Sequence, residues 1–150
     1  MADLRACAPG RSRGGLTTRI HAVTEARGLP IALKLTAGHA HHGRSADDMP
    51  DTVGAGQTLI ADAAHDGNRL RERLAALGAK AVIRPIPRRS DPLPLDRAAY
   101  RRRDRFERFF SKLKHHRAVA TRCEKHNADF LALVKLAATR IWLRACESVS

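Results

Sequence analysis

Four side chains with different chemistries fall on one side of a predicted helix over residues 97–116. At about 100° per residue, Tyr100, Arg103, Glu107 and Lys114 lie within about 60° of one another around the helix axis. Arg103 and Glu107 are four residues apart, so an ion pair worth about 0.2–0.5 kcal/mol explains two of them. Tyr100 and Lys114 stay unexplained by pairing. This stripe, with one carboxylate and two cations beside a phenol, is therefore a candidate functional site that can bind ions.

The same helix has two further faces. One is apolar and suited to packing on a sheet, with Phe106, Phe109, Phe110 and Leu113. The other is wholly basic, with Arg101, Arg105, Arg108 and Lys112. Residues 97–125 hold eleven Lys or Arg against three acidic residues, a net charge of +8. Because phosphates on the surface would relieve this self-repulsion, the region is expected to bind nucleic acid. A solvated charged face is the alternative explanation.

Asp62 is the second candidate for chemistry, since it directly follows the apolar run Leu59–Ala61. In open α/β sheets, ligands bind beyond the carboxyl ends of the strands, where a carboxylate can reach them. The structural alternative is that Asp62 caps the helix that follows. Its position alone does not decide between the two interpretations.

The strands and helices that position these residues can be predicted from the pattern of hydrophobic residues. Alternation over residues 16–36 predicts an antiparallel hairpin with a turn at 25–30. Apolar runs at 59–61 and 81–83 flank a helical pattern over 68–77, which predicts a βαβ unit with parallel strands. A further helix is predicted at about 126–144. Residues 1–15 are predicted to be an irregular lead-in, and residues 16–145 a single domain.

Composition narrows the classes of protein. The 150 residues carry 28 Lys or Arg and 15 Asp or Glu, a net charge of +13, which favours a polyanionic partner. No apolar run is long enough to span a membrane, and the first residues do not resemble a signal peptide. Three cysteines without a CxxC pattern favour a reducing, cytoplasmic setting. The loop histidines His39, His41 and His42 have no Cys or Asp partner in register and are interpreted as a polar loop.

The order Tyr100, two residues, Arg103, three residues, Glu107, six residues, Lys114 resembles the Y-(2)-R-(3)-E-(6)-K motif of bacterial insertion-sequence transposases of the DDE type. The blocks GRSRGGLTTRIHAV, TLIADAAHDGNRLRERL and FLALVKLAATRIWLR resemble that family too. The resemblance extends from about residue 10 to residue 144. It differs three residues after Asp62, where the family has an aromatic residue and this chain has His65.

The resemblance implies an RNase H-like mixed sheet with flanking helices and three carboxylates that converge on divalent metal, Mg²⁺ or Mn²⁺. By position, Asp62 matches the second catalytic aspartate and Glu107 the catalytic glutamate, both as metal ligands. Arg103 and Lys114 match residues that contact the DNA backbone near the cut. Tyr100 and the basic face (Arg101, Arg105, Arg108, Lys112) are expected to add DNA contacts. The physical chemistry agrees, because Mg²⁺ prefers hard oxygen ligands and two such ions assist phosphoryl transfer.

The family's first catalytic aspartate lies on an opening strand well before the GRSRGG block, whereas nine residues precede that block in this chain. The sequence therefore predicts a C-terminal part of a transposase that lacks its first strand and first aspartate, and that cleaves and joins DNA weakly or not at all alone. The expected partners are insertion-sequence ends, target DNA, and a second copy or an N-terminal half, in a bacterial nucleoid-associated setting. The alternative is a basic nucleic-acid-binding protein without catalysis.

Overall fold

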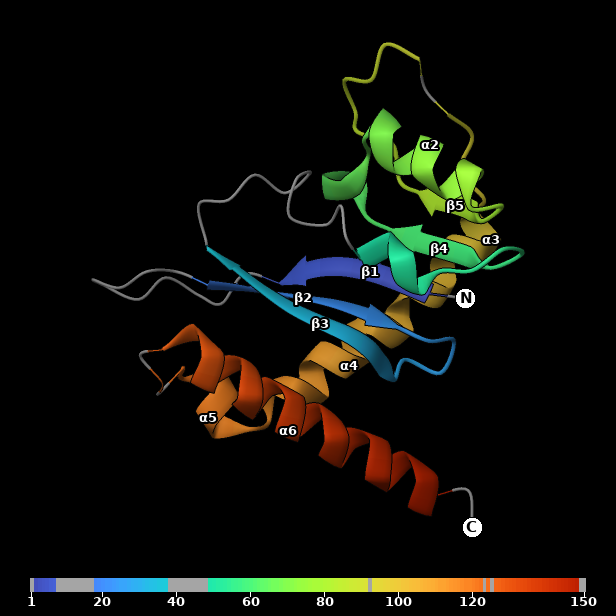
Figure 1. The fold of residues 1–150 in the computed structure, drawn as a ribbon. Coiled ribbons are helices and arrows are strands. Elements are labelled where there is room, and N and C mark those ends of the chain that lie inside the picture. Colours follow the sequence, from blue (N-terminus) through green and yellow to red (C-terminus); the bar gives the residue numbers. More distant parts are fainter. Residues whose placement is uncertain are drawn as a thin grey trace.

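The computed structural model describes residues 2–7, 18–37, 49–91, 93–122, 124 and 126–148, with residues 2–7 described by their backbone. A five-stranded mixed sheet in the order β3-β2-β1-β4-β5 forms its centre (Figure 1). The strands are β1 (Ala2–Cys7), β2 (Thr18–Thr24), β3 (Pro30–Ala37), β4 (Thr58–Ala61) and β5 (Lys80–Ile83). The helices are η1 (Met49–Thr52), η2 (Ala63–His65), α2 (Asn68–Ala76), α3 (Arg97–Tyr100), η3 (Arg101–Arg103), α4 (Asp104–Lys114), α5 (Arg117–Ala120) and α6 (Asn127–Glu147).

The central strand of the sheet is β1, which corrects two predictions made from the sequence. It pairs antiparallel with β2 and parallel with β4, so the sheet does not lack its first strand, and Ala2–Cys7 is not irregular. Ala2, Leu4 and Ala6 alternate with polar or sulfur-containing residues, a pattern too short to predict a strand by itself. Its pairing with β4 joins segments more than fifty residues apart, which local pattern cannot predict. Residues 8–15 of the predicted lead-in lie outside the described residues.

The hairpin and the βαβ unit are confirmed. β2 and β3 are antiparallel neighbours, while β4 and β5 are parallel and joined through α2. Val23, Leu59 and Ala61 pack with Leu70 and Leu74 of α2 on one face of the sheet. The predicted loop histidines lie outside the described residues.

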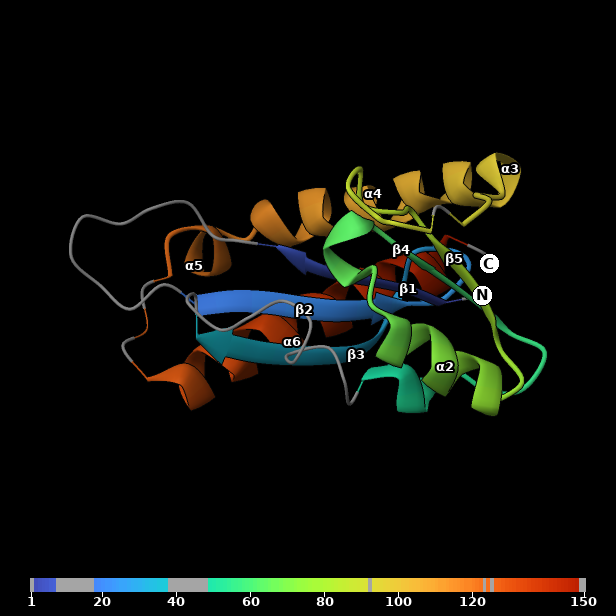
Figure 2. The same ribbon diagram turned by 90° about the horizontal axis from the view of Figure 1, so that it is seen from above.

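The opposite face of the sheet is covered by α4, α5 and α6 (Figure 1). All four predicted apolar residues of α4 are buried there, and they pack with Ile20 and Ala22 of β2. The predicted helix over 97–116 is interrupted by the 3₁₀ turn η3, yet α3 and α4 continue along one line (Figure 2). On α6, Phe130, Val134, Ala137 and Ile141 are buried, and Trp142 packs against the same core. Trp142 also donates a hydrogen bond from Nε1 to the carbonyl oxygen of Pro30.

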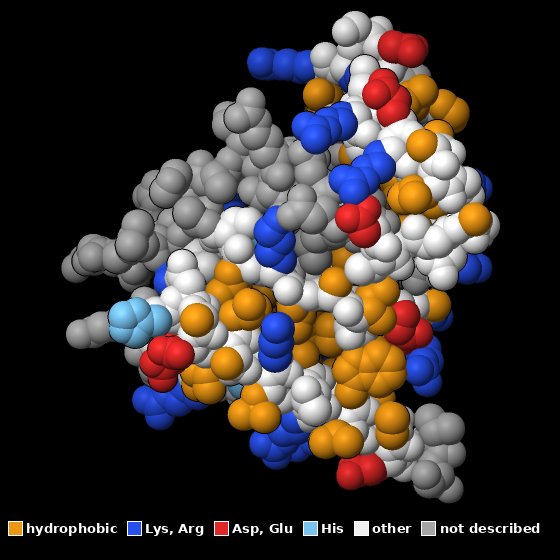
Figure 3. Space-filling model, viewed as in Figure 1, with side chains coloured by type: hydrophobic (Ala, Val, Ile, Leu, Met, Phe, Trp, Pro, Cys, Tyr) orange, Lys and Arg blue, Asp and Glu red, His pale blue; other side chains and the backbone are white. Residues whose placement is uncertain are grey.

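The outer side of α6 remains apolar at the surface. Leu136 is 68% exposed and Leu143 is 59% exposed, because the apolar stripe of this helix is wider than the face that packs on the sheet. Hydrophobic side chains accordingly gather over α6 in Figure 3. Among the described residues, no helix has the length and apolar character needed to cross a membrane.

The turn between β2 and β3 fixes the position of α4. Gly28 has φ +84°, and a Cβ on it would stand 2.8 Å from the carbonyl oxygen of Arg105 in α4. The Arg105 side chain in turn donates a hydrogen bond to the carbonyl oxygen of Ala26. Only a residue without a side chain allows the turn and the helix to approach this closely.

Replacing Gly28 by Ala is expected to lower the free energy of unfolding by about 1–3 kcal/mol, from backbone strain and from the clash with α4. Urea denaturation of the purified chain measures the change. Gly54→Ala is the matched control, since its nearest neighbour would be Gln57 Cδ at 3.9 Å. Equal stability of the two variants would show that the close approach to α4 carries no strain.

Candidate nucleic-acid and metal site

Asp62 lies at the carboxyl end of β4, at the edge where the sequence placed it. Its backbone is extended (φ −84°, ψ 177°), and its Oδ1 accepts a hydrogen bond from the amide of Ala64, which makes it the N-cap of η2. Asp62 can therefore cap η2 and also contact a ligand, because its side chain is still 23% exposed in the capping position. Asp62 is therefore oriented by its own turn and still reaches solvent.

His65 is the side chain that supports Asp62 from the interior. Its Nδ1 lies 2.8 Å from Asp62 Oδ1, and its side chain is only 1% exposed. The ring occupies a buried position next to the carboxylate, where the resemblance in sequence implies an aromatic residue. His65 thus provides a buried ring at this position and also a polar contact to Asp62.

Arg84 follows the neighbouring strand β5, and its backbone bonds to the residue before Asp62. Ala61 and Ile83 are paired in the parallel ladder, and the amide of Arg84 donates to the carbonyl oxygen of Ala61 at 3.2 Å. Arg84 also lines a pocket of about 550 Å³, whose other lining residues are Leu95, Arg97, Tyr100 and Arg101. Three arginines and a phenol therefore meet at the end of β5. Sequence reasoning did not select Arg84 or Arg97, since neither belongs to the motif.

Arg103 joins the members of the motif on the adjacent helices. It donates from Nη1 to the Tyr100 hydroxyl at 2.8 Å and from Nη2 to Glu107 Oε1 at 3.0 Å. Its guanidinium also lies 5.3 Å from the centre of the Tyr100 ring, a cation–π contact. Because Tyr100 shares a pocket with Arg84, this chain of contacts links the motif residues to the end of β5.

The predicted DNA contacts have different surroundings. Arg101, Arg105, Arg108, Lys112 and Lys114 are all exposed, as the three-faced helix predicted. Arg105 is bound to the turn before β3 and Arg108 pairs with Asp104 at 2.7 Å, so both have structural partners. Lys112 lies in a separate pocket between α4 and α6.

The donor chemistry of Asp62 and Glu107 fits a divalent metal, since both offer carboxylate oxygens and both are partly exposed. Within the described side chains, no group of three or more His, Cys, Asp or Glu is placed to hold a metal ion. Asp3 is described by its backbone, which pairs with Ile60, two residues before Asp62. The described side chains thus offer two carboxylates, those of Asp62 and Glu107. A third acidic residue, Asp3, lies on the strand next to β4.

A buried ionic clamp holds the two loops at this edge together, and sequence reasoning missed it. The Asp66 side chain is fully buried; its Oδ1 accepts hydrogen bonds from Arg71 and Arg89, and its Oδ2 accepts one from the amide of Ile86. Burial opposes ionisation, but the Ile86 amide, the Arg71 hydrogen bonds and the charges of both arginines together hold the pKa of Asp66 below its ordinary value of 3.8. This clamp ties the segment after β5, which carries Arg84, to the segment after β4, which carries Asp62.

Comparisons with known proteins identify the family that this chain resembles in sequence. The family described as "Transposase DDE domain" matches residues 3–142. A protein of Brucella ovis, "Putative transposase for insertion sequence element IS6501", is 41% identical over 130 residues, which are 86% of this chain and all of that protein.

Among solved structures, a chain of the simian T-cell lymphotropic virus intasome, in complex with the PP2A regulatory subunit B56 gamma, superposes with a TM-score of 0.52 at 9% identity. The match covers 89% of this chain and 46% of that one. The mixed α/β fold thus resembles the RNase H-like fold of retroviral integrases. From its sequence match over most of its length, this chain belongs to the DDE transposase domain family.

Proposed function

We propose that this chain carries the metal-dependent DNA strand cleavage and strand transfer of an insertion sequence. Three observations support it: the hydrogen bond between the strand ends that precede Asp62 and carry Arg84, the pocket that Arg84 shares with Tyr100, and the contacts of Arg103 with Tyr100 and Glu107. Asp62 and Glu107 are the proposed metal-binding carboxylates. When bound, Mg²⁺ or Mn²⁺ would stabilise developing charge on phosphate oxygens and lower the pKa of an attacking water.

The protein's own residues orient and hold the reactants. The Ala64 amide and His65 set the direction of the Asp62 carboxylate, and Arg103 holds Glu107 against the start of α4. Arg84, Arg97 and Arg101 line the adjoining pocket and bind the phosphate backbone next to the cut. Lys114, exposed two turns beyond Glu107, is proposed to extend that contact along the strand.

For the first catalytic carboxylate we propose Asp3. Its residue pairs with Thr24 on one side and Ile60 on the other, in the middle of the sheet and on the strand next to β4. The sequence alone argued against Asp3, because it lies close to the GRSRGG block and its surroundings do not resemble the family's opening strand; the proposal depends instead on the central position of β1 in the sheet. Self-association, or assembly with an N-terminal half, stays a prediction.

The second candidate function is nucleic-acid binding without catalysis. It is favoured by the absence of a three-residue metal cluster among the described side chains. It is also consistent with the Arg103–Glu107 pair, since such pairs stabilise ordinary helices. The two candidates differ in whether removing a carboxylate changes chemistry or leaves binding alone.

The test is nicking of supercoiled plasmid, and joining of an oligonucleotide 3′ end to it, by the purified chain in Mg²⁺, in Mn²⁺ and in EDTA. We expect weak activity of the chain alone in both metals and none in EDTA, with Asp62→Asn and Asp3→Asn each inactive. Wild-type activity in Asp3→Asn would remove Asp3 from the site. Binding of plasmid without any nicking in either metal would support the non-catalytic candidate instead.

A further inference from the structure

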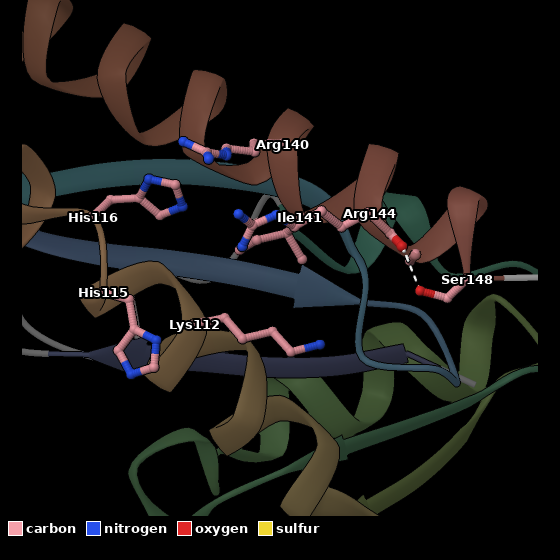
Figure 4. Close-up of a pocket in the computed structure, with 8 residues that line it drawn as sticks. Lys112, His115, His116, Arg140, Ile141, Arg144 and Ser148 are labelled. Atoms are coloured by element: carbon pink, nitrogen blue, oxygen red, sulfur yellow. Dashed lines mark hydrogen bonds between the residues drawn. The ribbon is translucent and has the colours of Figure 1, made fainter.

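A second cationic pocket lies between the end of α4 and α6, away from the motif. It has a volume of about 360 Å³, and its lining includes Lys112, His115, His116, Arg140, Ile141 and Arg144. Figure 4 shows Arg140, Ile141 and Arg144 reaching from α6 toward the side that Lys112 and the two histidines occupy. Three cations and two imidazoles therefore surround one hollow, which is formed by α6, the end of α4 and the two residues that follow α4.

The charge of this pocket is not neutralised within the part of the chain that the structure describes. Lys112, Arg140 and Arg144 form no ion pair with a described carboxylate, and no Asp or Glu lines the pocket. Other arginines do have such partners; Arg71 and Arg89, for example, both pair with Asp66. Uncompensated cations that converge on one hollow offer charge-assisted hydrogen bonds to an anion.

The pocket is separate from the candidate catalytic site. At about 100° per residue, Lys112 lies roughly 140° around α4 from Glu107, and the buried apolar face of the helix stands between them on the core side. The carboxyl end of α4 contributes a partial negative charge of about half an electron, which three full positive charges outweigh. The hollow therefore favours an anion of its own.

We propose that this pocket binds a phosphate group of a nucleic-acid backbone and forms a second DNA contact on the side of α4 opposite Glu107. The inference rests on the proposed function for its ligand. A DNA strand fits better than an isolated anion because Arg101, Arg108 and Lys112 are exposed on the basic face of α3–α4 that leads to the pocket. A neutral histidine adds one N–H donor to a phosphate oxygen.

The test is the salt dependence of binding to a 20-base-pair duplex, for the full chain and for the double variant Arg140→Gln/Arg144→Gln. We expect the slope of log affinity against log salt to become less steep by about 0.9 for each phosphate that the variant no longer neutralises. Affinity at low salt is expected to fall on the order of tenfold, because the substitutions remove charge-assisted hydrogen bonds to phosphate. Urea denaturation checks that the two proteins are equally stable. We expect equal stability because the side chains of Arg140 and Arg144 are exposed.

The single variant Arg140→Gln is measured as well, and Lys135→Gln is its matched control, since it also removes one exposed charge from α6, about 140° away around the helix. The control is expected to bind like wild type. Equal slopes for wild type and the double variant would overturn the proposal, and so would a pocket that binds only inorganic phosphate. Cleavage by the double variant at saturating DNA, with weakened binding, would separate this proposal from the catalytic one.

Discussion

Replacing Glu107 by Gln is expected to reduce metal-dependent strand cleavage on the order of 10³-fold, because loss of a metal-binding carboxylate removes several kcal/mol of transition-state stabilisation. Glutamine keeps the shape of the side chain and its contact with Arg103, which now lies 3.0 Å from Oε1. The DNA affinity of Glu107→Gln is expected to equal or exceed that of wild type, because the substitution removes a negative charge from a basic surface. Single-turnover cleavage and fluorescence anisotropy measure the two effects on one protein.

Asp104→Asn is the matched control for Glu107→Gln. It removes a carboxylate from the same turn of α4 and breaks an equivalent surface pair, between Asp104 and Arg108 at 2.7 Å. Both variants are expected to lose only about 0.2–0.5 kcal/mol of stability. Cleavage should fall in Glu107→Gln alone. Parallel losses in both variants would contradict a metal-binding role and indicate a general effect of charge on the helix.

Replacing Asp66 by Asn is expected to lower the free energy of unfolding by about 2–4 kcal/mol, because it leaves two arginines facing one another without their buried carboxylate. Solvent screening moderates the loss, since the arginine side chains are 16–17% exposed while Asp66 is fully buried. Urea denaturation at neutral pH measures the change. Asp51→Asn, which breaks an exposed pair with Arg73, is the control and should lose less than about 1 kcal/mol.

The same clamp makes stability depend on acid. The pKa of Asp66 is depressed in the folded chain, so its contribution is fully present above the ordinary value of 3.8 and is lost as pH falls toward the folded pKa. Wild type should therefore lose its advantage over Asp66→Asn below about pH 3.8. A constant difference between the two proteins from neutral pH to strong acid would show that the ionised carboxylate is not what stabilises the loops.

The elements with strong local patterns could be predicted from sequence. The alternation in the hairpin, the spacing of Leu70 and Leu74, and the four buried residues of α4 each encode burial within a short window. The division of this helix into three faces also predicted correctly which residues are exposed and basic and which are buried in the core. Four motif residues could be chosen because their spacing places them on one stripe, and Arg103 does contact both Tyr100 and Glu107.

What the sequence alone determined was therefore the family, the helix that carries Tyr100, Arg103 and Glu107, and the strand end at Asp62. Only the tertiary structure decided that Ala2–Cys7 is the central strand, because its two pairings join distant segments. It also decided that Arg84 bonds to the end of β4, that Asp66 is held by two arginines, and that Arg140 and Arg144 share a pocket with Lys112. Each of these depends on which remote surfaces pack together, whereas helical and strand periodicity report only which side of an element is buried.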